Sequence, residues 1–307
     1  MILTICPNPC IDYTMELEAL NVGKLNRVNG KNITYAGKAL NVAIVLSRLK
    51  GESYATGFMF NENGRLFEQN LDREGIPNTF IWNKGSVRTN YKFIDKKSMM
   101  TEVNDKGEEV TQEKQVELLE LVSNLSKKCD YAIMSGSLPS GVDNDFYLKL
   151  SKVMPKSVKK VIDTEGQKML LALENGAVLV KPNKNELEEF AKKELHTTKD
   201  ILKASYTLLD KGAENVLVSL GREGAIITNG MKSYFCKSIQ VAVNSTVGAG
   251  DSMVAAAILQ MQNGAGLADI LKSGVAAGTA AITKSGTLLC TREKYLEVLE
   301  GLKVEEI

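Results

Sequence analysis

Short apolar runs alternate along the chain with stretches in which apolar residues recur at helical spacing. The apolar runs are typical of buried strands and lie at residues 2–6, 54–59, 131–134, 158–162, 178–180 and 216–219. Helical spacing occurs between them, at residues 37–49, 111–127, 143–153, 183–193 and 198–211. Strands that are apolar on both faces and separated by helices form parallel sheets with helices on each face. The alternation therefore predicts an α/β fold with a mainly parallel sheet.

Two segments, residues 13–35 and 87–104, break this alternation. Both contain alternating β-forming and polar residues with polar turns between them, a pattern typical of strands with one exposed face. They predict a small β layer beside the main sheet. Because no internal repeat or low-complexity linker divides the chain, we expect a single domain over residues 1–307 that carries this β layer as an appendage.

The charge balance of the chain excludes some classes of partner. Lys and Arg total 38 and Asp and Glu total 37, so the net charge of +1 creates no field that favours nucleic acid or anionic lipid. The first residues lack the basic and long apolar regions of a secretory signal, and no apolar run approaches the ~20 residues of a membrane span. We therefore expect a cytoplasmic protein that binds neither nucleic acid nor membrane.

The counts of cysteine and histidine limit the kinds of catalytic group that this chain can use. The 5 cysteines are scattered and odd in number, which does not suit a disulfide framework. The single histidine, His196, excludes a metal centre built from several histidines and gives no support to a Ser-His-Asp triad. Catalysis in this chain must therefore use carboxylates, lysines, backbone amides or a metal held by oxygen atoms.

The strongest local signal for a site is the segment 244–251, Asn-Ser-Thr-Val-Gly-Ala-Gly-Asp, which precedes a helical stretch. Small residues at Gly248, Ala249 and Gly250 let consecutive amides turn toward one point at a helix N-terminus, where the helix dipole also favours an anion. Asp251 could take the proton of a hydroxyl group that attacks a phosphoryl group held there. The alternative is that Asp251 only caps the helix and that the glycines only turn the chain.

This segment resembles the C-terminal signature of the ribokinase-like (PfkB) carbohydrate kinases, and the resemblance extends over essentially the whole chain. In that family the last Asp of the Gly-Ala-Gly-Asp run is the catalytic base. The resemblance therefore implies this role for Asp251, with Gly248, Ala249 and Gly250 as the rest of the catalytic loop. The loop is distinct from a P-loop, because no Gly-x-x-x-x-Gly-Lys-Ser/Thr motif occurs in the chain.

The resemblance also implies a ribokinase-like α/β fold, in which helices sandwich a mainly parallel sheet. The segments at about 13–35 and 87–104 would then form a small β-sheet lid. Such a lid excludes water, which otherwise competes for the phosphoryl group. Because lids often pair with one another in this family, the resemblance implies a homodimer through the lid.

ATP and Mg²⁺ are the cofactors that the resemblance implies. Asn183 and Glu186 follow a predicted strand and form either a helix capping box or a pair that acts on hydrated Mg²⁺ through water, and the two interpretations are compatible. Residues 218–225 resemble the nucleotide loop of the family, although a glycine turn is the alternative. The adenine would lie over residues 275–281. The nucleotide-binding residues implied are Lys181, Asn183, Glu186, Ser219, Gly221, Gly224, Thr246, Gly248 and Gly250.

The acceptor side resembles the branch of the family that contains 1-phosphofructokinase and tagatose-6-phosphate kinase. Lys38 begins a predicted helix, where its amine can bind a substrate phosphate with charge-assisted hydrogen bonds of about 1.5 to 3 kcal/mol each. A turn carboxylate at residue 12, exposed strand charges at 88–90 and a tight turn at 135–141 are the alternatives. The acceptor residues implied are Asp12, Gly37, Lys38, Asn41, Arg88, Asn90 and Ser137.

The reaction implied is the phosphorylation of a ketohexose phosphate by ATP. Residues 12–13, 88–92 and 101–104 look closer to 1-phosphofructokinases, which convert fructose 1-phosphate to fructose 1,6-bisphosphate. Tagatose-6-phosphate kinase is the alternative, and a catalytically silent sugar-phosphate sensor is a more distant one. The chain departs from the branch at Ala36, at Ala39 and at residues 105–107. Because the catalytic loop is intact, these departures bear on the substrate rather than on the reaction.

Overall fold

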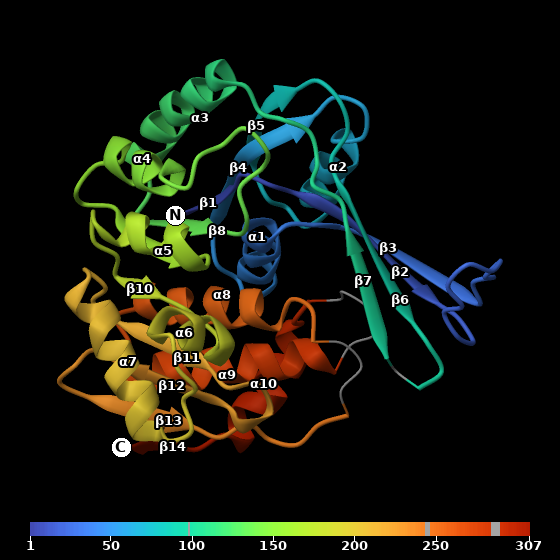
Figure 1. Cartoon of the computed structure of the whole chain (residues 1–307). Helices are drawn as coiled ribbons and strands as arrows, with labels where there is room; N and C mark the ends of the chain where they lie inside the picture. Colours follow the sequence, from blue (N-terminus) through green and yellow to red (C-terminus); the bar gives the residue numbers. More distant parts are fainter. Residues whose placement is uncertain (98, 243–245, 284–288) are drawn as a thin grey trace.

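The predicted parallel sheet forms the centre of the molecule. The computed structural model describes residues 1–97, 99–242, 246–283 and 289–307. Within these residues a ten-stranded sheet has the order β14-β13-β12-β11-β10-β9-β8-β1-β4-β5 (Figure 1). From β5 to β11 the strands run parallel, and β12, β13 and β14 continue the sheet antiparallel. The strands are β1 (Ile2–Cys6), β4 (Ser53–Phe60), β5 (Asn78–Asn83), β8 (Tyr131–Ser135), β9 (Lys159–Asp163), β10 (Leu179–Val180), β11 (Val216–Ser219), β12 (Ala225–Thr228), β13 (Ser233–Cys236) and β14 (Val304–Glu306).

Two series of helices pack along this sheet. Helices α1, α8, α9 and α10 contact one another in turn, and helices α3 to α7 form the second series. The helices are α1 (Lys38–Arg48), α2 (Arg65–Arg73), α3 (Gln112–Leu125), α4 (Phe146–Val153), α5 (Gly166–Leu173), α6 (Lys184–Ala191), α7 (Thr198–Asp210), α8 (Ala249–Gln262), α9 (Leu267–Ile282) and α10 (Arg292–Gly301). Within the described ranges, no helix combines the length and apolar character that crossing a bilayer requires. The predicted α/β fold is confirmed.

The antiparallel end of the sheet did not follow from the sequence pattern. Strands β12 and β13 have 4 residues each and β14 has 3, so none is long enough to establish a periodicity of its own. Strand β14 comes from the C-terminal end of the chain and pairs with β13. The parallel strands β1, β4, β8, β9, β10 and β11 were predictable because each is a separate and mostly buried apolar run, whereas the parallel strand β5 is only partly buried and was not predicted.

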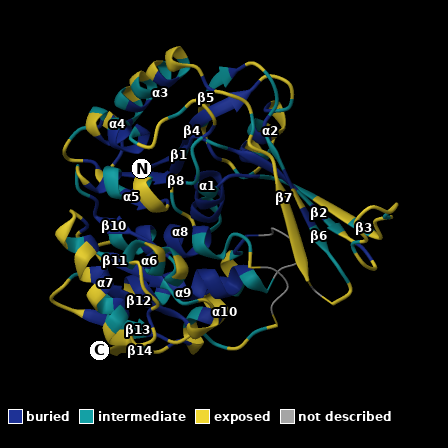
Figure 2. Cartoon of the chain, in the orientation of Figure 1, coloured by how far each residue is buried: buried dark blue, intermediate teal, exposed yellow. Residues whose placement is uncertain are grey.

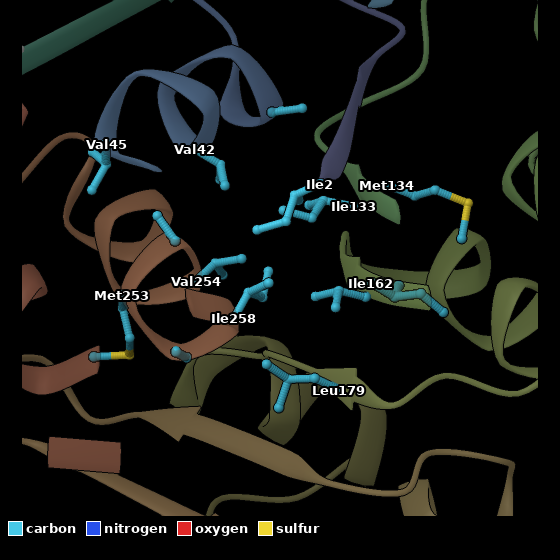
Figure 3. Packing of buried hydrophobic residues seen from close by; sticks show 14 of the residues in the cluster. Ile2, Val42, Val45, Ile133, Met134, Ile162, Leu179, Met253, Val254 and Ile258 are labelled. Atoms are coloured by element: carbon cyan, nitrogen blue, oxygen red, sulfur yellow. The ribbon is translucent and has the colours of Figure 1, made fainter. Parts of the chain in front are cut away.

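Helix α8 lies in the core and carries the Gly-Ala-Gly-Asp motif at its first turn. Residues 251–258 of this helix are all buried, because α8 packs between α1 and α9. Figure 3 shows Val254 and Ile258 of α8 near Val42 of α1 and the strand residues Ile2 and Ile133. A helix that is apolar all round must be buried on every side. The core therefore holds the N-terminus of α8 in one position.

A second, four-stranded sheet extends from the body of the molecule, as the resemblance implied (Figure 1). Its order is β3-β2-β6-β7, with β2 and β6 parallel and the outer pairs antiparallel. Its strands are β2 (Cys10–Glu16), β3 (Gly30–Ala36), β6 (Thr89–Ile94) and β7 (Met100–Asn104). Asp12 lies inside β2 and is not the turn carboxylate of the alternative interpretation, because the bend that separates β1 from β2 lies at residues 7–9.

The two faces of the second sheet differ in polarity. Asp12 and Thr14 of β2 share one face with Asn90 and Lys92 of β6, and all of them are buried. We call this the inner face, because Asp12 and Asn90 line the cavity described below. The opposite, outer face has a row of apolar residues in register across the strands, namely Ile33, Tyr13, Tyr91 and Val103. Figure 2 shows that β7 is exposed along its length.

Candidate active site

The elements of the fold enclose a cavity of about 620 Å³. Its walls come from the carboxyl ends of parallel strands, the N-termini of α1 and α8, helix α9 and the inner face of the second sheet. A cavity of this size suits a pair of small ligands such as a nucleotide and a sugar. Every residue that the sequence analysis assigned to the site lines this cavity. Asn244 and Ser245, the first residues of the motif, lie outside the described residues.

Asp251 lies in the first turn of α8 with its carboxylate at the cavity. Its exposure is only 7%, and its Oδ2 accepts a hydrogen bond of 2.7 Å from Nδ2 of Asn41 on α1. The N-cap of α8 is Gly248, so the alternative in which Asp251 caps the helix is wrong. The carboxylate is instead oriented by a side chain 210 residues away.

The glycine at the helix start has a conformational reason. Gly248 adopts φ 78°, in the left-handed region, and a Cβ atom there would lie 2.4 Å from Cδ2 of Leu289. Only glycine adopts this conformation without strain. The turn places the first residues of α8 at the cavity, where the N-terminus of the helix favours an anion.

A network of charged side chains lines the cavity, and the sequence analysis missed its central residue, Asp163. Asp163, at the end of β9, is 1% exposed. Its carboxylate accepts a 2.9 Å hydrogen bond from Oγ of Ser135, and lies 3.1 Å from Nζ of Lys181 and 4.0 Å from Nζ of Lys38. Residues 163–165 are polar and directly follow a predicted strand, which is the signal that could have identified them.

The network sets the protonation of these groups. Burial opposes the ionisation of Asp163, but the charges of Lys181 and Lys38 outweigh burial and lower its pKa. The charge of Asp163 in turn raises the pKa of Lys38, against burial. Asp163 and Lys38 are therefore both charged at neutral pH.

Asp251 behaves differently from Asp163. Burial raises the pKa of Asp251 to about 6, and the negative charge of Asp163 adds to this rise, while Lys38 and the hydrogen bond from Asn41 oppose it. A carboxylate with a pKa just below neutral pH is mostly ionised at pH 7 and still accepts a proton readily. These properties suit a general base.

The pKa of Asp251 predicts the pH dependence of catalysis. A base must be ionised to accept a proton, so kcat/KM is expected to fall about tenfold per pH unit below about pH 6 and to level off above it. The measurement is kcat/KM for the acceptor between pH 5 and 8, at saturating ATP. A profile that stays flat down to pH 5 would contradict this assignment.

At one end of the cavity, Asn183 and Glu186 form the predicted capping box. Oδ1 of Asn183 accepts from the backbone N–H of Glu186 at 2.9 Å, and Oε2 of Glu186 accepts from the backbone N–H of Asn183 at 2.8 Å. The described residues contain no cluster of three or more His, Cys, Asp or Glu side chains that could hold a metal. The side-chain oxygens of Asn183 and Glu186 fit a hydrated Mg²⁺ instead, because this ion keeps several of its waters and takes phosphate oxygens as other ligands.

An apolar slot adjoins this end. Its walls include Val275, Gly278 and Ile282 of α9 and Met253 of α8. The segment predicted to lie under the adenine, residues 275–281, thus contributes directly to the cavity wall. The small side chains of this part of α9 leave room for a flat ring.

The other end of the cavity carries groups suited to a sugar phosphate. Asp12 is 3% exposed, and its Oδ1 accepts from Nδ2 of Asn90 at 3.0 Å. Nη1 of Arg88 donates to Oδ1 of Asn90 at 3.1 Å, and its Nε is buried without a hydrogen-bond partner in the described part of the chain. Oγ of Ser137 accepts from Nδ2 of Asn8 at 3.0 Å. Asn90 is therefore buried in the site, and is not the exposed strand residue that was the alternative.

The helix start at Lys38 is also explained by local geometry. Gly37 is the N-cap of α1 with φ 155°, and a Cβ atom there would lie 2.6 Å from Sγ of Cys6. A glycine lets the chain pass close to β1 before α1 begins. Lys38 is half-buried at the cavity, between the acceptor end and Asp163.

Comparisons with known proteins agree with this geometry. The family model described as "pfkB family carbohydrate kinase" matches residues 7–294. The 1-phosphofructokinase of Borreliella burgdorferi is 34% identical over 100% of this chain and 99% of its own length, and that of Vibrio cholerae is 31% identical over 100% and 97%. The crystal structure of phosphofructokinase-2 from Escherichia coli with substrates and products superimposes with a TM-score of 0.91 and 28% identity, covering 98% of each chain.

Proposed function

Because this chain belongs to the PfkB family of carbohydrate kinases, we propose that it transfers the γ-phosphoryl group of ATP to a primary hydroxyl group of fructose 1-phosphate. The product is fructose 1,6-bisphosphate. The observation that carries this proposal is the position of Asp251, a base with a pKa of about 6 at a helix N-terminus, in a cavity with basic and carboxylate groups on its acceptor side. Similar proteins named 1-phosphofructokinase support the choice of sugar.

In this mechanism Asp251 accepts the proton of the attacking hydroxyl group, a contribution of about 10² to 10⁴ in rate. The N-terminal amides of α8, at Ala249 and Gly250, stabilise negative charge on the phosphoryl group. Lys181, held by Asp163, adds positive charge beside Gly250, where a Cβ atom would lie 3.4 Å from its Nζ. Mg²⁺, held through water by Asn183 and Glu186, would supply further neutralisation of the nucleotide phosphates.

Nucleotide binding uses the residues between the capping box and α9. Ser219, Gly221 and Gly224 lie around the end of β11 and Thr246 precedes α8, so their hydroxyl and amide groups face the phosphates and ribose of ATP. The adenine occupies the apolar slot of α8 and α9. This arrangement directs the γ-phosphoryl group toward the first turn of α8.

Lys38 and Arg88 bind the phosphate that the acceptor already carries. The buried, unpartnered Nε of Arg88 is a donor that a phosphate oxygen would satisfy. Asp12 and Asn90 accept and donate hydrogen bonds to the sugar hydroxyls, with Gly37, Asn41 and Ser137 completing the pocket. Tagatose 6-phosphate remains the alternative acceptor. Each ketohexose carries a CH₂ group at both ends, so one site can hold the phosphate at one end and present a hydroxyl group at the other in either compound.

The proposed activity is tested by ADP release with a panel of acceptors. Fructose 1-phosphate, tagatose 6-phosphate, fructose 6-phosphate and fructose are compared at equal concentration with ATP, with and without Mg²⁺. The highest kcat/KM is expected for fructose 1-phosphate, with loss of turnover on chelation of Mg²⁺. A higher kcat/KM for tagatose 6-phosphate would make that compound the assigned acceptor. A sugar phosphate that stabilises the folded protein without ADP release would favour a sensor.

Replacing Lys38 is expected to weaken binding of the acceptor phosphate. Lys38→Met should raise KM for fructose 1-phosphate by about 10- to 100-fold, since one or two charge-assisted hydrogen bonds are lost. The KM for ATP should change little. Lys184→Met is the matched control, because Lys184 lies on α6 outside the cavity lining. An unchanged KM in Lys38→Met would place the phosphate elsewhere.

We further infer that the second sheet acts as a lid and pairs with the lid of a second copy. The outer face exposes an apolar row in which Tyr91 is 41% and Val103 is 55% exposed, with the rings of Tyr13 and Tyr91 5.9 Å apart. Covering such a row in a homodimer would remove apolar surface from water. Sedimentation equilibrium should give twice the chain mass, and Val103→Glu should give the monomer. A monomeric wild type would exclude this dimer.

A further inference from the structure

The inner face of the second sheet contains a buried ion pair whose lysine, Lys92, the mechanism above does not use. Nζ of Lys92 on β6 lies 2.8 Å from Oδ2 of Asp12 on β2, and the two side chains are 7% and 4% exposed. Asp12 lines the cavity, whereas Lys92 is not among its lining residues in the described part of the chain. Lys92 therefore reaches the site only through Asp12.

The strand register explains how one carboxylate receives two donors. Asp12 is opposite Asn90 in the parallel pair β2–β6, and Thr14 is opposite Lys92. Asn90 and Lys92 are two residues apart, so their side chains lie on the same face. Asn90 donates to Oδ1 and Lys92 donates to Oδ2. Oδ1 also accepts from Sγ of Cys10 at 3.5 Å. With donors on both oxygens, the plane of the carboxylate is fixed, and Oδ2, which has Lys92 as its donor, keeps acceptor capacity for a ligand hydroxyl.

The burial of this pair makes it energetically different from an ordinary surface ion pair. A carboxylate that is almost fully buried loses several kcal/mol of hydration, which only a nearby opposite charge and good hydrogen bonds offset. The segments that follow β2 and β6 are joined by another ion pair, between Lys96 and Glu18, whose side chains are 69% and 66% exposed. An exposed pair of that kind contributes at most about 1 kcal/mol.

We propose that Lys92 is a positioning residue for the acceptor sugar, which supplies the counter-charge of Asp12 and holds its carboxylate in the orientation that receives the sugar hydroxyls. This inference rests on the proposed function, in which Asp12 contacts the sugar. It assigns to Lys92 an effect on acceptor affinity without contact between Lys92 and the substrate. In this proposal the contact between Asp12 of β2 and the sugar depends on Lys92 of β6.

The test is a double-mutant cycle on acceptor binding. The variants are Lys92→Met, Asp12→Asn and the double variant, and Lys96→Met is the matched control for loss of an exposed ion pair just beyond the ends of the same two strands. ADP release is measured against fructose 1-phosphate and against ATP. Lys92→Met is expected to raise KM for the sugar by about 10- to 100-fold with KM for ATP unchanged. Lys92→Arg, which keeps the charge, should recover part of this loss.

The cycle separates a role through Asp12 from a general effect on the fold. If Lys92 acts through Asp12, the double variant binds the sugar no worse than Asp12→Asn alone. A wild-type sugar KM in Lys92→Met, or a loss in the double variant equal to the product of the single losses, would overturn the inference. Lys96→Met should stay within about twofold of the wild type.

Two further outcomes remain interpretable. If Lys92→Met does not fold, the comparison moves to Asp12→Asn against the double variant, both of which lack the buried carboxylate charge. An equal KM for the sugar in these two variants supports the inference, and a higher KM in the double variant contradicts it. Absence of turnover by the wild type with every sugar phosphate would overturn the proposed function itself, so the two failures are distinguishable.

Discussion

Asp251→Asn is expected to lower turnover by at least about 100-fold while leaving ATP binding intact. The carboxamide has nearly the same shape and can still accept the hydrogen bond that Asn41 donates to Asp251, but it cannot take up a proton. The loss should therefore appear in kcat rather than in the KM for either substrate. Steady-state ADP release and a nucleotide binding titration measure the two quantities.

The thermal stability of the variant tests whether loss of folding is the cause of the lower turnover. The folded-state pKa of Asp251 is raised to about 6 from 3.8, so this group stabilises the fold below about pH 4 and the contribution is lost as pH rises through 6. At pH 7 the ionised carboxylate is a cost on the order of 3 kcal/mol. Asp251→Asn should therefore unfold at the same or a higher temperature than the wild type.

A matched control exists in the neighbouring helix. Asp269 lies in the first turn of α9 and is exposed, so Asp269→Asn makes the same chemical change at a helix start outside the cavity. Its turnover should equal that of the wild type. Near-normal turnover in Asp251→Asn would remove Asp251 from the role of base.

Asp163→Asn is expected to lower the free energy of unfolding by about 3 to 5 kcal/mol at pH 7, as loss of one partner of a buried ion pair does. Lys181 is 5% exposed and would keep its charge next to a neutral carboxamide. Because the pKa of Asp163 is lowered in the folded state, its stabilising contribution is present at pH 7 and is lost as pH falls below the ordinary aspartate range. Urea unfolding at pH 7 measures the change.

The same variant should also alter the pH profile of catalysis. The negative charge of Asp163 raises the pKa of Asp251, so its removal should move the acid limb of kcat/KM to lower pH. Glu117→Gln breaks the partly exposed pair with Lys114 on α3 and is the control, with an expected loss below about 1 kcal/mol. An Asp163→Asn variant as stable as this control would show that the network contributes little to folding.

Local sequence was sufficient for the parts of the site that are continuous in the chain. The loop before Asp251 places amides and carboxylate within a few residues, so its chemistry could be inferred before any contact was known. The capping box of Asn183 and Glu186 is equally local, because residues three apart meet at a helix start. Roles for these residues in catalysis and metal binding stay predictions.

The contacts that tune the site were not predictable in this way. Asp163 meets Lys181 because β9 and β10 are neighbours in the sheet, and Lys92 meets Asp12 because β6 pairs with β2 across 80 residues. Polar residues at these strand ends and faces are visible in the sequence. Their partners are not, because strand order depends on how the whole chain packs.

Hydrophobic periodicity alone determined that this chain forms a parallel sheet between helices, because each apolar run and each helical stretch must bury its own surface. It also determined where most of these elements begin and end. The tertiary structure alone decided which strands adjoin, and hence which buried charges act on Asp251. Electrostatic effects fall off with distance and grow with burial, so the pKa of that carboxylate depends on spatial neighbours that sequence spacing does not specify.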